Sequence, residues 1–162
     1  MRNLAFATVL FIVISCSDSE VGDLTGEELN YTLFSGSEFG YEGDLLIQEK
    51  KDGQARITIE LSGPEGEAFF PVHLHYNSFT TPDAEVAALL SPVNARNGIS
   101  ITDLDFLSDD SRVTYKDMVS FDGHVKIHLD DGVNQDVILA FTNIGANKEM
   151  IDGEAAQCNG PN

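Results

Sequence analysis

The sequence predicts an all-β domain, an antiparallel Greek-key sandwich or barrel with one short helix. Seven or eight short segments are rich in β-branched and aromatic residues, and glycine, proline or aspartate turn signals separate them. Residues 56–61 alternate between apolar and polar types, so that Ile57, Ile59 and Leu61 share one face of a strand. Many short strands separated by frequent turns are typical of sandwiches and barrels. Residues 30–150 are enough for one such domain with its own core.

The expected strands follow one another along the chain. Residues 40–49 and 56–61 predict a hairpin, because the Asp-Gly turn at Asp52-Gly53 lies between them. The other expected strands are 30–34, 69–76, 99–107, 125–129 and 137–141.

Two segments favour helix instead. Residues 83–90 are the best candidate for the short helix, since residues 81–83 are a typical helix start and Pro92 follows the end. Thr114 and Asp117 have the spacing of a capping box, which favours a single helical turn beginning there.

The four histidines fall into two close pairs, and they are the candidate metal ligands. His73 and His75 occupy positions i and i+2 of an expected strand, so they share a face with Cα atoms roughly 6–7 Å apart. Two such imidazoles can share one ion, and His128 would supply a third. On a straight strand His124 lies about 13 Å from His128, which is too far unless the strand bends near Gly123. The alternative is that these histidines are exposed or hydrogen-bonded residues without a metal.

The N-terminus indicates export. Residues 4–14 form an apolar run too short to cross a bilayer as a permanent helix, and Ser15-Cys16 follows it directly. This resembles the lipobox of bacterial lipoproteins, which implies lipidation of Cys16 and an anchor on the outer membrane or cell surface. An ordinary signal peptide is the alternative. The expected segments are a signal peptide (1–16), an acidic tether (17–29), the β-domain (30–150) and a polar tail (151–162).

The charge of the chain limits its possible binding partners, and its cysteine content limits its possible disulfides. The chain has 27 acidic and 9 basic residues and a formal net charge of −18, which disfavours nucleic acid and anionic lipid headgroups as partners. Without residues 1–16, which contain Arg2 and no acid, the charge becomes −19. If Cys16 is lipidated, Cys158 is the remaining thiol and an intramolecular disulfide is excluded. If Cys16 is retained, a bridge from Cys16 to Cys158 would join the termini.

Two pairs of aspartates are expected on the solvent-exposed surface. Asp130 and Asp131 stand beside Gly132 and predict a solvated turn, whereas Asp103 and Asp105 fall on the polar side of an alternating strand. The chain contains no recognisable hydrolase constellation and no glycine-rich phosphate loop.

The order of these motifs resembles the copper/zinc superoxide dismutase family. Residues 43–76 contain a strand, an Asp-Gly hairpin, an alternating strand, a Gly-Pro-x-Gly-Glu loop and a His-x-His strand; residues 125–145 contain a Val-x-x-His strand, an Asp-Asp loop and a last strand ending in glycine. The resemblance implies that His73, His75 and His128 take the places of copper ligands. The chordin-type domain, which also has a His-x-His strand, is a second resemblance that these motifs do not separate from the first.

The chain departs from the dismutase pattern in ways that bear on function. It has no histidine between His75 and Ile99, so the zinc subloop of the family has no counterpart. Phe141 stands where the second disulfide cysteine would be, and residues 135–138 lack the arginine that guides superoxide. The expected function is therefore an exported lipoprotein whose domain binds copper or zinc, to store, buffer or pass on the ion without efficient dismutase turnover. A copper-only dismutase and a non-catalytic chordin-like surface module are the alternatives.

Overall fold

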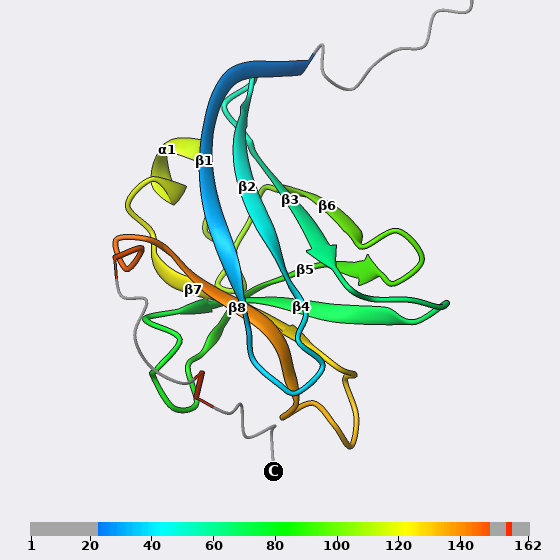
Figure 1. Cartoon of the computed structure of the whole chain (residues 1–162). Coiled ribbons are helices and arrows are strands. Elements are labelled where there is room, and N and C mark those ends of the chain that lie inside the picture. The colour runs from blue at the N-terminus through cyan, green and yellow to red at the C-terminus, as the bar shows by residue number, and fades with distance from the viewer. Residues whose placement is uncertain (1–22, 150–154, 157–162) are drawn as a thin grey trace, which may run out of the picture.

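The computed structural model describes residues 23–149, 155 and 156, and these form a closed antiparallel barrel of eight strands (Figure 1). The predicted all-β class is confirmed. The elements are β1 (Leu24–Ser35), β2 (Glu42–Lys50), β3 (Ala55–Ser62), β4 (Phe69–Tyr76), β5 (Val86–Asn94), β6 (Ile99–Leu104), α1 (Tyr115–Met118), β7 (Asp122–His128) and β8 (Ile138–Gly145). No helix in this part of the chain is long and apolar enough to cross a membrane.

The strands are ordered β1-β2-β3-β6-β5-β4-β7-β8 around the barrel, and β1 closes it by pairing with β8. Strands β4, β5 and β6 are consecutive neighbours, and β7 returns to lie beside β4. This arrangement is a Greek key. It brings together the two strands that carry the histidines, although nearly fifty residues separate them in sequence.

The interior is filled by the apolar residues of the alternating strands. In the β2–β3 hairpin Leu45 lies opposite Ile59 and Ile47 opposite Ile57, and all four side chains are buried. Each such side chain contributes roughly 1.5–3 kcal/mol through its removal from water. The predicted turn is also present: Gly53 adopts a positive φ of 85° and donates its N–H to the Lys50 carbonyl.

The helix predictions had different outcomes. Thr114 caps α1, with both hydrogen bonds of the capping box to Asp117, as predicted. The helix predicted at 83–90 is wrong, since Val86–Asn94 is strand β5, paired along β4. Alanine and leucine favour helix intrinsically, but the backbone groups of β4 offer this segment a ladder partner, and tertiary pairing overrides the local preference.

The boundary of the acidic tether also needs correction. Residues 24–29 belong to β1, where Glu28 pairs with Gln48 of β2. Most of their side chains are exposed, so no apolar alternation marks them as strand in the sequence; backbone pairing with β2 holds them. Cys16, Cys158, the signal segment 1–16 and most of the tail 151–162 lie outside the described residues.

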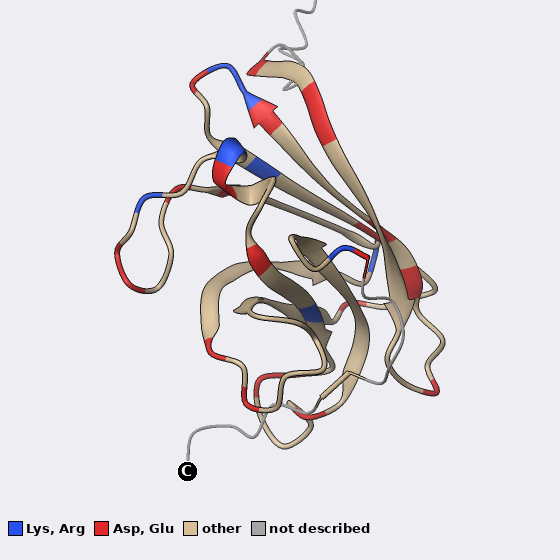
Figure 2. Cartoon of the chain, turned by 90° about the vertical axis from the view of Figure 1, so that its left-hand side faces the viewer, with Lys and Arg blue, Asp and Glu red and all other residues tan. Residues whose placement is uncertain are grey.

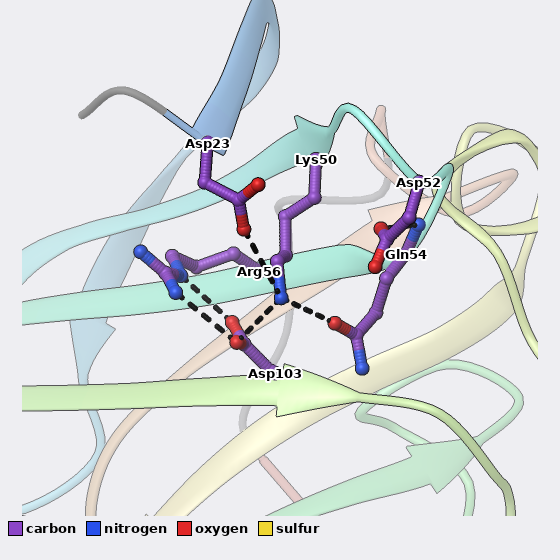
Figure 3. A network of polar contacts seen from close by, with 6 residues as sticks. All are labelled: Asp23, Lys50, Asp52, Gln54, Arg56 and Asp103. Carbon is purple, nitrogen blue, oxygen red and sulfur yellow. Dashed lines mark hydrogen bonds and ion pairs between the residues drawn. The ribbon is translucent and has the colours of Figure 1, made fainter. Parts of the chain in front are cut away.

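A polar network joins three neighbouring strands, β2, β3 and β6, to Asp23, the residue that precedes β1 (Figure 3). Asp103 of β6 accepts two hydrogen bonds from Arg56 of β3, at 2.7 and 3.1 Å, and one from Lys50 of β2, at 2.8 Å. Lys50 also donates to Gln54 and lies 3.5 Å from the Asp23 carboxylate. The hydrogen bond from Arg56, followed by the one from Lys50, lowers the pKa of Asp103 to about 2.

We expect Asp103→Asn to lower the free energy of unfolding by about 1 kcal/mol in urea denaturation near neutral pH, because two cations lose their shared anion. The expected loss is small because the Asp103 side chain is 33% exposed and solvent screens the pairs. Asp105→Asn removes a neighbouring exposed carboxylate outside the network, so it should leave stability unchanged. Equal effects of the two substitutions would contradict a stabilising role for the network.

Candidate metal centre

The histidines lie on the outer face of β4 and β7. Val72 and Leu74 point into the core, so strand alternation directs His73 and His75 outward. The ladder places His75 opposite His124 and His73 opposite Lys126. The outer face is nevertheless enclosed, because His75, His124 and His128 are at most 1% exposed and only His73 is partly open.

Three of the four histidines converge. His73, His75 and His128 each place a ring nitrogen within 4.8 Å of the others, an arrangement that could hold a metal ion. Bonds from imidazole nitrogen to zinc are about 2.0–2.1 Å, so each nitrogen would need to move inward by less than about 1 Å to share one ion. These three residues therefore fit a metal ion by donor type and by spacing.

His124 occupies a different place. Its ring stacks on that of His75, with centroids 4.9 Å apart and an interplanar angle of 8°. It lies outside the group of three, and β7 does not fold back to bring it in beside His128. His124 therefore packs against the face of the His75 ring.

Backbone carbonyls orient the buried rings. The Nδ1 atoms of His75, His124 and His128 lie 2.9, 2.7 and 2.7 Å from the carbonyl oxygens of Ala84, Asn77 and Gln135. A carbonyl can only accept, so each neutral ring carries its proton on Nδ1 and keeps a lone pair on Nε2. Nδ1 fixed in this way is typical of histidines that ligate through Nε2.

Two of these Nε2 atoms are buried without a hydrogen-bond partner, namely those of His124 and His128. An unsatisfied buried acceptor costs roughly 1–3 kcal/mol. For His128, a metal ion shared with His73 and His75 would satisfy the lone pair. The orphaned nitrogen is therefore an observation in favour of a ligand at this face.

The carbonyls come from two loops that cover the outer face. Residues 77–85 are held by Phe79, which packs on Ile138 and Phe141 and donates its N–H to the Asn143 side chain. Residues 129–137 are held by Asp130, which accepts hydrogen bonds from the N–H groups of Gly132 and Asn134. The predicted turn at Asp130 is thus present.

Burial keeps the imidazoles neutral. Desolvation is the largest cause lowering the pKa of His75 to about 3 and those of His124 and His128 to about 4. The pKa of His73 is also lowered by desolvation, although the nearby Asp131 carboxylate raises it. At neutral pH the protein therefore presents unprotonated rings, the form that a metal requires.

Sequence reasoning missed two charged residues at this face. Lys126 is fully buried and donates a hydrogen bond from Nζ to the Ala156 carbonyl at 2.5 Å. Its positive charge contributes to lowering the pKa values of His75, His124 and His128. It lies midway between His124 and His128 on the same strand, so alternation could have identified it. Asp131, expected only in a solvated turn, has Oδ1 3.7 Å from Nε2 of His73.

Known proteins give no further guide to this face. Comparisons of the chain with models of protein families, with curated proteins and with solved structures found no match, so the resemblance to superoxide dismutase and chordin-type domains stays a prediction from the sequence.

Proposed function

We propose that this protein binds one copper or zinc ion through His73, His75 and His128. The observation that carries the proposal is their convergence on an enclosed face, with Nε2 of His128 buried and without a hydrogen-bond partner. Copper would add a redox-active centre to this face, and zinc a Lewis acid without redox chemistry. The chain's own contribution is three oriented, neutral imidazoles.

We propose holding or passing on the ion rather than efficient turnover of superoxide. Acidic residues occur on strands and loops throughout Figure 2, whereas lysine and arginine are few, and the formal net charge is −18. Such a surface repels an anionic substrate and raises the local concentration of cations. The location proposed from residues 1–16 is the bacterial cell envelope, with a lipid on Cys16 as the anchor.

Titration of the purified, metal-free protein with Cu²⁺ or Zn²⁺ tests the proposal. We expect one equivalent to bind tightly, as measured by competition with a chromophoric chelator, and to raise the melting temperature. Binding at a free concentration of 100 times Kd stabilises the folded state by about 2.7 kcal/mol.

Mg²⁺ is the control ion. It prefers oxygen ligands, so any shift caused by the abundant carboxylates would appear with Mg²⁺ as well. A melting temperature raised equally by Mg²⁺ and Zn²⁺, or the absence of a tight first equivalent, would contradict a histidine site.

A further inference from the structure

A hollow of about 360 Å³ opens on the outer face of β4 and β5, beside His73. This volume falls in the range of small-molecule sites, about 300–1,000 Å³. The residues that line it include Phe69, Pro71, His73, Leu89, Pro92 and Asp131.

The hollow lies at an irregularity in the ladder. Phe70 pairs with Val93 and Val72 with Leu90, so Pro71 of β4 stands against two residues of β5, one of which is Pro92. Proline has no N–H to donate, and paired strands accept it at such bulges. The two strands therefore lack regular pairing at this point, and the surface is recessed.

The walls are apolar and open to solvent. Phe69 and Leu89 are 62% and 72% exposed, and Leu89 lies directly opposite His73 in the ladder. Large apolar side chains gathered around a recess are typical of a binding surface, since their exposure together has no benefit for folding.

The polar groups of the hollow are His73 and Asp131. Asp131 Oδ1 lies 3.7 Å from His73 Nε2, and the Asp131 side chain is 74% exposed. The lining contains neither lysine nor arginine. One end of an apolar recess thus carries a carboxylate that is accessible to a cation from solvent.

We propose that this hollow binds a small molecule with an apolar body and one protonated amine. The body would pack against Phe69, Leu89 and Pro92, and the ammonium group would pair with Asp131. Asp131 and the acidic surface repel a carboxylate or phosphate.

Benzylamine, benzyl alcohol and benzoate provide matched probes, which share a ring and differ in charge. Each is titrated into the metal-free protein in the presence of a chelator, and amide NMR shifts of Phe69, Leu89 and Leu90 report binding. We expect benzylamine to bind roughly fivefold more tightly than benzyl alcohol, and benzoate more weakly than either.

Asp131→Asn should bring the affinity for benzylamine down to that for benzyl alcohol. Asp136→Asn is the matched control, since it makes the same charge change on an exposed residue of the same loop and should keep the preference. Leu89→Ser should weaken all three probes because it removes a wall.

Equal binding of benzoate and benzylamine would overturn the proposal, as would a preference that survives Asp131→Asn. It would also fail if none of the probes shifted these amides, or if the shifts followed protein concentration, which would make a second copy of the chain the occupant. All titrations are made without metal, so their result is independent of whether the histidines bind an ion.

Discussion

Replacement of His128 by alanine is expected to lower the affinity for Cu²⁺ or Zn²⁺ by about a hundredfold or more, because the loss of a ligand should exceed the 10–100-fold loss typical of an outer-shell partner. His75→Ala should have a similar effect, since both rings are buried and held by carbonyls. His73→Ala should also weaken binding strongly, although His73 is partly exposed, so that a water molecule could take the place of its ring as a ligand. Chelator competition at neutral pH measures each affinity.

His124→Ala is the matched control for this series. It removes a buried imidazole from the same face, and so reproduces the packing loss, but it removes no member of the converging group. We expect an effect of less than about tenfold, through the ring of His75 on which His124 stacks. Circular dichroism should show that each variant keeps its strands. Small and equal effects from all four substitutions would mean that the histidines share no ion.

Much of this face could be predicted from the sequence, because strand alternation is a strictly local property. A His-x-His strand places both rings on one side whatever the rest of the chain does. The same rule places His124, Lys126 and His128 together on β7. What it cannot supply is the pairing of β4 with β7, which brings His75 opposite His124 and His128 close to His73. That register depends on the Greek-key crossing between distant segments.

Two features of the site could not be predicted from the local sequence. The segment at 83–90 contains alanine and leucine in a pattern compatible with either helix or strand, and only the available ladder on β4 decides for strand. Asp131 belongs to an ordinary Asp-Asp-Gly turn in the sequence. The position of Asp131 beside His73 depends on the conformation of the whole loop 129–137. Hydrogen bonds of Asp130 within the loop, and the one from His128 Nδ1 to the Gln135 carbonyl, hold this loop against the outer face.

The metal-free protein is expected to lose stability steeply as the pH falls from about 6.5 toward about 4. An unfolded histidine takes up a proton near pH 6.5. The folded rings of His75, His124 and His128 do not, because desolvation lowers their pKa values to about 3, 4 and 4. Between these limits unfolding binds protons, so the free energy of unfolding decreases with decreasing pH. Each histidine contributes a slope of up to about 1.4 kcal/mol per pH unit.

His124→Asn isolates one of these contributions. The asparagine amide can donate to the Asn77 carbonyl from nearly the position of the histidine Nδ1, and it does not titrate. Urea denaturation between about pH 5 and pH 6.5, in the presence of a chelator, should show a slope shallower by up to about 1.4 kcal/mol per pH unit than that of the original protein. Asp103, with a pKa of about 2, titrates below this window and does not interfere. If stability is flat over this range, the histidines of the folded protein are protonated as readily as those of the unfolded chain. If His124→Asn leaves the slope unchanged, the same holds for His124. Either result would contradict an enclosed face of neutral histidines.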